Sequence, residues 1–306
     1  MRHYNQNLTE ILFHLAVALV VVTGLAQAAP LKVGGAEIKI DGGTTGYRVT
    51  RAQIEGAVEA AARATAAYFG KFPVRKLTVT VKPFERGTTG IFGRSLDGAE
   101  VVLYLGTAVE WPKLKKDWIL AHEMFHLGFP TLQGQDPDWL GEGLATYQEP
   151  MARARDGQLT QEEVWHELID GFTDALPAPG DGGLNSETRY RRIYWGGALF
   201  WFLMDLEIRE KSQNKKSLDD ALILIWKDHG TAKNFVPLKT FLAKFDKAVG
   251  YPLVQKYYKR FANTPATEDL SALWKKLGVA QNGETANLDD LAPWAHVRRS
   301  LTGRRP

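Results

Sequence analysis

Ala121-His-Glu-Met-Phe-His126, followed by Asp138-Trp-Leu-Gly-Glu-Gly-Leu-Ala145, is the most informative part of this sequence. It contains H-E-x-x-H, with a glutamate, Glu142, sixteen positions after the second histidine. His122 and His126 are four residues apart, so a helix presents both imidazoles on one face, where one divalent cation can bind both. Glu142 is the candidate third ligand, and Glu123 can hold a water molecule against the metal. Three protein ligands leave a fourth coordination position open, as catalysis requires.

The residues around this motif favour a helix. Residues 116–127 contain neither proline nor glycine, and Gly128 and Pro130 then supply a stop. We therefore expect one helix over 116–128. The alternative is a buried helix whose two histidines bond to carbonyl groups, which would make the motif a coincidence.

The composition limits the classes of protein to consider. The 306 residues suffice for two domains or one large domain, and the 44% apolar content is that of an ordinary globular protein. A net charge of +3 does not favour nucleic acid as a partner. The chain has no cysteine, which excludes disulfides, thiolate catalysis and cysteine-based zinc sites. Four arginines near the C-terminus predict a solvated basic tail, with a contact to an anionic lipid or polymer as the alternative: Arg298, Arg299, Arg304 and Arg305.

The N-terminus resembles a secretory signal peptide. Arg2 and His3 precede an apolar run over 11–25, which ends in Ala26-Gln-Ala28. We expect residues 1–28 to be cleaved off and the protein to be exported, either to the periplasm or outside the cell. An uncleaved membrane anchor over 11–29 is the alternative. No other segment is apolar and long enough to cross a membrane, so no stable span is expected after cleavage.

The periodicity of the remaining chain predicts an α+β protein. Strands are expected within 31–48, with a turn at Asp41-Gly-Gly43, and at 77–81 and 101–105. A helix is expected over 51–69, and the glycine-rich residues 87–98 are expected to form a flexible hairpin connection. Residues 29–150 would then form a small mixed lobe with the metal helix and the third-ligand helix. Residues 151–306 would form a helical lobe with the basic tail, its helices at 160–170, 197–212, 217–228, 236–248, 251–262 and 267–277.

These residues could hydrolyse an amide bond. Zinc held by His122, His126 and Glu142 would lower the pKa of its water, and Glu123 would take the proton and deliver it to the leaving amine. The oxyanion needs a donor beside the metal, and a tyrosine hydroxyl can serve. Glu149 lies seven residues after Glu142 on the same helix face. It is either a carboxylate that orients a ligand histidine or an ordinary exposed glutamate at a helix end.

Together these features resemble the gluzincin metallopeptidases, and most closely the glycyl-aminopeptidase-like and aminopeptidase-N-like enzymes. The stretches that carry the resemblance are 122–126, the run Trp139-Leu-Gly-Glu-Gly-Leu-Ala-Thr-Tyr147, the run Tyr194-Trp-Gly-Gly-Ala-Leu199, and Ser217-Leu-Asp-Asp220. The resemblance implies that His122, His126 and Glu142 bind Zn²⁺ and that Glu123 is the general base. It also implies that Tyr194 stabilises the oxyanion and that Glu149 supports a ligand. The implied fold is a thermolysin-like catalytic domain, with the zinc in a cleft between an α/β lobe and a helical lobe.

The sequence departs from this family at several points. Gly196 stands where the family usually has lysine, and the segment between His126 and Glu142 is short. No G-x-M-E-N-like segment precedes the metal helix, and Glu100 and Asp97 are the candidates to replace its amine-binding glutamate. The expected function is that of an exported zinc metallopeptidase that acts on peptides or proteins, with endopeptidase and aminopeptidase specificity both open. The alternatives are a zinc amidase that acts on another envelope amide and a binding domain without turnover.

Overall fold

The computed structural model describes residues 29–303 except 44, 97 and 135–137. The predicted signal peptide and the arginines at 304 and 305 lie outside the described residues. The helices of the described chain are α1 (Arg51–Phe69), α2 (Trp111–Lys116), α3 (Ile119–His126), α4 (Trp139–Arg155), α5 (Gln161–Phe172), α6 (Tyr190–Ser212), α7 (Leu218–His229), α8 (Leu238–Val249), α9 (Val254–Ala262), α10 (Leu270–Leu277) and α11 (Ala295–Thr302). The strands are β1 (Leu31–Val33), β2 (Ala36–Asp41), β3 (Lys76–Pro83), β4 (Ile91–Leu96), β5 (Glu100–Leu105), β6 (Thr131–Gln133), β7 (Phe235–Pro237), β8 (Val279–Asn282) and β9 (Thr285–Leu288).

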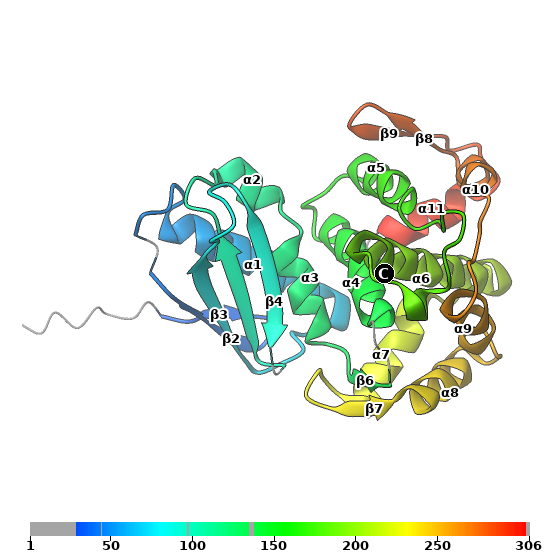
Figure 1. Cartoon of the computed structure of the whole chain (residues 1–306), viewed down its shortest axis with the longest axis horizontal. Coiled ribbons are helices and arrows are strands. Elements are labelled where there is room, and N and C mark those ends of the chain that lie inside the picture. The colour runs from blue at the N-terminus through cyan, green and yellow to red at the C-terminus, as the bar shows by residue number, and fades with distance from the viewer. Residues whose placement is uncertain (1–28, 44, 97, 135–137, 304–306) are drawn as a thin grey trace, which may run out of the picture.

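The first part of the chain is a five-stranded mixed sheet in the order β1-β2-β3-β5-β4. β2, β3 and β5 are parallel, while β1 and β4 pair antiparallel at the two edges. Helices α1 and α3 pack on the sheet and share one apolar core with it (Figure 1). The helix predicted over 51–69 is confirmed as α1, which begins at a Thr50–Gln53 capping box and ends at Gly70 in the left-handed conformation.

The edge strand β4 corrects one expectation from the sequence. Residues 87–98 were predicted to be a flexible hairpin connection, but residues 91–96 form a strand in full antiparallel register with β5. Glycines inside this segment obscured the strand pattern, because glycine normally weakens strands. The predicted turn at 41–43 coincides with the end of β2, where the chain bends and Gly42 has a φ of 102°, while the turn between β1 and β2 is at Gly34-Gly35, which the sequence prediction did not name.

The metal helix is shorter than the sequence predicted. The expected helix over 116–128 is interrupted at Asp117, which separates α2 from α3. The Asp117 carboxylate accepts a hydrogen bond from the backbone N–H of Ile119 at 3.0 Å. An aspartate that bonds its neighbouring backbone competes with continued helix, so α3 starts afresh after it.

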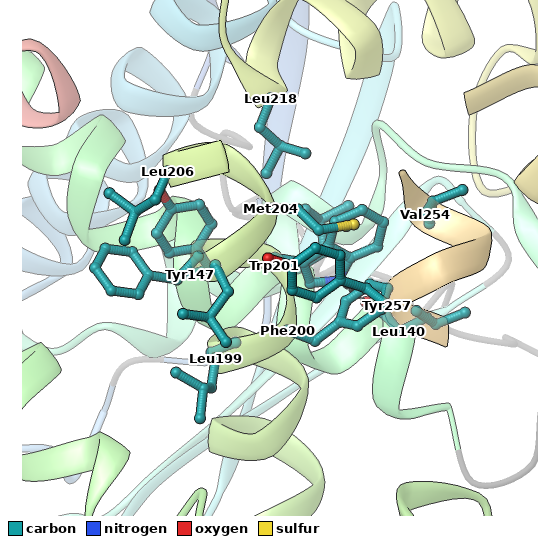
Figure 2. Packing of buried hydrophobic residues seen from close by; sticks show 14 of the residues in the cluster. Leu140, Tyr147, Leu199, Phe200, Trp201, Met204, Leu206, Leu218, Val254 and Tyr257 are labelled. Carbon is teal, nitrogen blue, oxygen red and sulfur yellow. Dashed lines mark hydrogen bonds between the residues drawn. The ribbon is translucent and has the colours of Figure 1, made fainter. Parts of the chain in front are cut away.

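The second part of the chain packs around α6, whose side chains are buried on several sides (Figure 2). Helix α4 crosses α6 closely, and both belong to the larger apolar core. The aromatic residues Phe200, Trp201 and Phe202 are fully buried there, as a role in the core requires. The predicted lobe boundary at residue 150 falls inside α4, which continues through Pro150 to Arg155. Its packing places α4 with the helices that follow it.

The C-terminal part is less purely helical than predicted. It contributes β7, which pairs in parallel with β6, and the β8–β9 hairpin. Arg298, predicted to lie in a solvated tail, is buried in α11 and donates to the carbonyls of Leu277, Gly278 and Asp289. None of the helices in the described part of the chain combines the length and the apolar character needed to cross a membrane.

Candidate metal centre

His122, His126 and Glu142 converge as the sequence predicted. The Nε2 atom of His122 lies 3.1 Å from Glu142 Oε2 and 3.2 Å from His126 Nε2, and His126 Nε2 lies 3.4 Å from Glu142 Oε2. In a tetrahedral zinc site with bonds of 2.0–2.1 Å, ligand atoms are about 3.3 Å apart. The three atoms therefore form one triangular face of such a tetrahedron, and their chemistry, two imidazole nitrogens and a carboxylate, fits zinc.

The charges of the three ligands are coupled. Burial alone would lower the pKa of His126, but the carboxylate of Glu142 outweighs burial and raises it to about 9 in the metal-free chain. Burial likewise favours a neutral Glu142, yet the two histidines hold the pKa of its carboxyl far below the usual range. A metal ion must therefore displace a proton from His126, as it does at zinc sites in general.

Aromatic rings fix the position of His122. Its imidazole is fully buried and stacks on Tyr194, with ring centroids 5.4 Å apart and planes inclined by 6°. The edge of Trp118 approaches the same imidazole at 4.9 Å. The Nδ1 atom of His122 has no hydrogen-bond partner among the residues described. Ring packing therefore orients this ligand.

Tyr194 reaches the site because α4 and α6 cross at glycines. A Cβ at Gly143 would lie 2.2 Å from the backbone of Gly197, and a Cβ at Gly197 would lie 2.1 Å from the Trp139 carbonyl oxygen. Gly143 follows Glu142 directly, and Gly197 lies one helical turn after Tyr194. The crossing thus sets the third ligand and the predicted oxyanion donor side by side. Burial, assisted by the nearby Glu142 carboxylate, raises the pKa of the Tyr194 hydroxyl and keeps it protonated.

Glu123 is held by the edge strand of the sheet. Its side chain is buried, and Oε2 accepts a hydrogen bond from the backbone N–H of Ser95 at 2.6 Å. A Cβ at Gly93 would lie 2.7 Å from Ile119 Cγ1 and 2.8 Å from Glu123 Cγ. Gly93 therefore allows β4 to approach the predicted general base closely. The sequence prediction missed both positions, although a glycine inside a strand is itself a signal of close approach.

Glu149 is buried, and its carboxylate accepts a hydrogen bond from Arg153 at 2.6 Å. Arg153 also donates to the carbonyl of Lys116. No hydrogen bond joins Glu149 to His122 or His126 among the described residues. Of the two candidates for an amine-binding acid, Glu100 accepts a hydrogen bond from the Thr80 hydroxyl within the sheet at 2.7 Å, and residue 97 lies outside the described residues.

Several solved structures are similar to this chain in their architecture. The chain matches an aminopeptidase N family protein from Idiomarina loihiensis with a TM-score of 0.58 at 16% identity, over 82% of this chain and 49% of that one. The chain has the fold of the M1 zinc metallopeptidases. It matches such an enzyme from Deinococcus radiodurans with a TM-score of 0.51 at 17% identity, over 79% of this chain and 52% of that one. A variant of a two-domain M1 zinc metallopeptidase bound to L-arginine matches with a TM-score of 0.51 at 16% identity, over 78% and 52%. The chain thus spans about half the length of these structures, whereas no protein-family model and no curated protein matches its sequence.

Gly196, where the resembling family usually has lysine, lies close to residues that precede α6. A Cβ at this position would lie 2.8 Å from a methyl carbon of Leu184 and 3.6 Å from the carbonyl oxygen of Ala175. The segment before α6 therefore packs directly against the backbone of that helix. A lysine at this position would have to displace the end of the Leu184 side chain.

Proposed function

We propose that this protein is a zinc-dependent metallopeptidase that hydrolyses peptide bonds. The observation that carries the proposal is the convergence of three ligand atoms at 3.1–3.4 Å, with a buried carboxylate and a tyrosine beside them. The fold of the chain supports it, because two of the similar solved structures are named as M1 zinc metallopeptidases. A thermolysin-like arrangement, with substrate between the sheet-containing lobe and the helical lobe, is part of the proposal.

Each residue of the site would have a separate role in hydrolysis. Bound zinc would be held by His122, His126 and Glu142 and would supply Lewis acidity to a water molecule and to the substrate carbonyl. Glu123 would accept the proton of the attacking water at its carboxylate and donate it to the leaving nitrogen. The Ser95 amide, by holding Oε2, would fix the direction in which Glu123 accepts that proton. The Tyr194 hydroxyl would donate a hydrogen bond to the developing oxyanion.

The decisive experiment separates metal binding from hydrolysis. Purified protein should contain about one zinc ion per chain. The variant Glu123→Gln should keep that zinc but lose hydrolysis of peptides, because the amide cannot accept the proton. Hydrolysis by Glu123→Gln at the native rate would show that the general base is wrongly assigned. Matched peptides with free and acetylated N-termini would then separate aminopeptidase from endopeptidase activity.

Two other functions give different results in the same assays. A zinc amidase that acts on another envelope amide would bind zinc and leave peptides intact, while Glu123 would still be required on its own substrate. A binding domain without turnover would show no difference between the native chain and Glu123→Gln on any amide. The presence of ligands, base and tyrosine together favours an enzyme over a binding domain.

We also propose that the protein is exported. The support is the sequence pattern of residues 1–28, in which an apolar run precedes Ala26-Gln-Ala28. N-terminal sequencing of the protein recovered from a cell-envelope fraction should begin at residue 29. Recovery of the intact N-terminus in the membrane fraction would instead indicate an uncleaved anchor.

A further inference from the structure

Two large aromatic side chains stand partly in solvent beside the metal centre. Trp118 is 39% exposed and Tyr190 is 79% exposed, although most aromatic rings of the described chain are buried. The Trp118 ring lies 6.5 Å from that of Tyr194, and Tyr190 lies one helical turn before Tyr194 on α6. Burial of such rings normally stabilises a fold, so exposure at this place calls for a ligand rather than for packing.

Trp118 is held in a fixed position next to a metal ligand. It lies between Asp117, whose carboxylate accepts from the Ile119 amide, and the first turn of α3. Its ring meets the His122 imidazole edge-on at 4.9 Å and lies 6.5 Å from the ring of Tyr194. The indole thus forms a rigid apolar surface directly beside the predicted oxyanion donor.

Tyr190 extends this surface along α6. It lies four residues before Tyr194, so the two side chains project from one face of the helix. Tyr190 also lines a cavity of about 440 Å³ at the start of α6, together with Leu176 and Thr173. The arginines of this cavity do not provide an anion site, because each is paired with an acid: Arg189 with Asp181 and Glu187, Arg191 with Asp174, and Arg192 with Glu187.

We propose that Trp118 and Tyr190 form, with Tyr194, an aromatic wall that binds the substrate side chain next to the scissile bond and selects bulky apolar or aromatic residues. This inference rests on the proposed peptidase function and deepens it. When a carbonyl oxygen of the substrate accepts a hydrogen bond from the Tyr194 hydroxyl, the position of the adjoining substrate residue is fixed. The side chain of that residue then lies within one residue of the wall, which is about 3.5 Å of extended chain. Stacking against two rings favours a flat or branched apolar group and gives a small or acidic side chain little to contact.

The test measures a specificity ratio. Peptides that differ only in the residue on either side of the cleaved bond, with Phe, Leu, Ala or Asp at that place, are compared by kcat/KM. In the native protein we expect Phe and Leu to exceed Ala and Asp by on the order of 10- to 100-fold on one side of the bond. Tyr190→Ala and Trp118→Ala should each lower the Phe-to-Ala ratio by on the order of 10-fold, while Trp118→Phe should keep most of it. Phe235→Ala, which removes an exposed aromatic ring on β7, is the matched control and should leave the ratio unchanged.

A binding measurement separates this inference from the proposed function. Titration of the same peptides into the Glu123→Gln variant reports affinity without turnover, and the Phe peptide should bind more tightly than the Ala peptide by a similar factor. Adding Tyr190→Ala to that variant should remove the difference. Equal ratios in the native protein, Tyr190→Ala and Trp118→Ala would overturn the aromatic wall. Absence of any cleavage would count against the peptidase function, and the binding titration would still decide for or against the wall.

Discussion

Gly143 and Gly197 bring the backbones of α4 and α6 into direct contact, since a Cβ on Gly143 would lie 2.2 Å from the carbonyl carbon of Gly197. This contact has a functional consequence because the neighbours of the two glycines are Glu142 and, one turn away, Tyr194. Any side chain at the crossing must push the helices apart. The third metal ligand and the predicted oxyanion donor would then move relative to each other.

Gly143→Ala should therefore damage both stability and metal binding. Overpacking of this kind costs about 1–3 kcal/mol, which should appear as a lower urea midpoint at an unchanged slope. Zinc affinity, measured by competition with a chelator, should fall as well. Gly56→Ala is the matched control, because a Cβ there would meet only Trp111 at an ordinary 3.7 Å in the interior of α1. Gly56→Ala should stabilise the protein by roughly 0.5–1 kcal/mol. A similar gain in stability in Gly143→Ala would show that a side chain at this position does not push α4 and α6 apart.

Gly93→Ala should reduce turnover without loss of zinc. The added methyl group would collide with Glu123 Cγ at 2.8 Å and move the base away from its place. A misplacement of about 1 Å can lower kcat by on the order of 100-fold. Zinc content should stay near one ion per chain, because the atoms nearest to the added methyl group belong to Ile119 and Glu123, neither of which is a predicted metal ligand. Arg94→Ala, at an exposed position on the same strand, is the control and should keep the native kcat. A native kcat in Gly93→Ala would show that the close approach of β4 to Glu123 does not position this side chain.

Tyr194→Phe should lower kcat by roughly 100- to 1000-fold, the usual cost of one oxyanion donor. The phenyl ring preserves the stacking on His122 at 5.4 Å, so zinc binding and the unfolding midpoint should remain close to native. Zinc content and kcat measured on the same preparation separate the two effects. An unchanged kcat would remove Tyr194 from the mechanism.

The sequence predicted those parts of the site that depend on local spacing. His122, His126 and Glu142 follow from helix periodicity and one motif, and the structure brings their ligand atoms together. Tyr194 could be chosen among ten tyrosines only through a family resemblance, because its place depends on a helix crossing far along the chain. The contact of Ser95 with Glu123 is a backbone contact, so the side chain of Ser95 carries no signal for it.

The predictions from the sequence that proved wrong failed for the same physical reason, a dependence on contacts far along the chain. The segment that contains β4 was predicted to be a flexible hairpin connection, because Gly93 contradicts strand propensity. The glycine at this position is explained by a tertiary contact with α3. Arg298 was predicted to lie in a solvated tail, yet its Nη1 atom donates to three backbone carbonyls at 2.8–3.0 Å inside the protein. In both cases a long-range partner overrides local preference.

Asp205→Ala should be strongly destabilising. The buried carboxylate of Asp205 accepts from the Tyr147 hydroxyl at 2.8 Å, from Arg209 at 3.0 Å and from the Leu218 amide at 2.8 Å, and so ties α4, α6 and α7 together. Removing one partner of a buried ion pair costs about 3–5 kcal/mol. Glu210→Ala is the control on the same helix, because its pair with Lys276 is half exposed and should contribute at most about 1 kcal/mol. Urea unfolding of both variants checks the difference, and equal losses would show that the buried network does not stabilise the helices.

Glu149 should make the stability of the protein fall as the pH rises from about 5 to about 8. Burial, reinforced by Glu167 on α5 and Asp117 before α3, raises the pKa of Glu149 to about 8, although Arg153 beside it acts in the opposite direction. The unfolded chain releases this proton near the ordinary value of 4.5, so between the two values the folded state holds more protons and loses stability with increasing pH, by up to about 1.4 kcal/mol per pH unit. Glu149→Gln cannot titrate, and its unfolding free energy should fall less steeply over the same range. Urea unfolding at pH 5, 6.5 and 8, with the difference between the two proteins taken at each pH, isolates this residue from the metal ligands. A difference that stays constant with pH would mean that Glu149 is ionised in the folded protein and that Arg153 outweighs its burial.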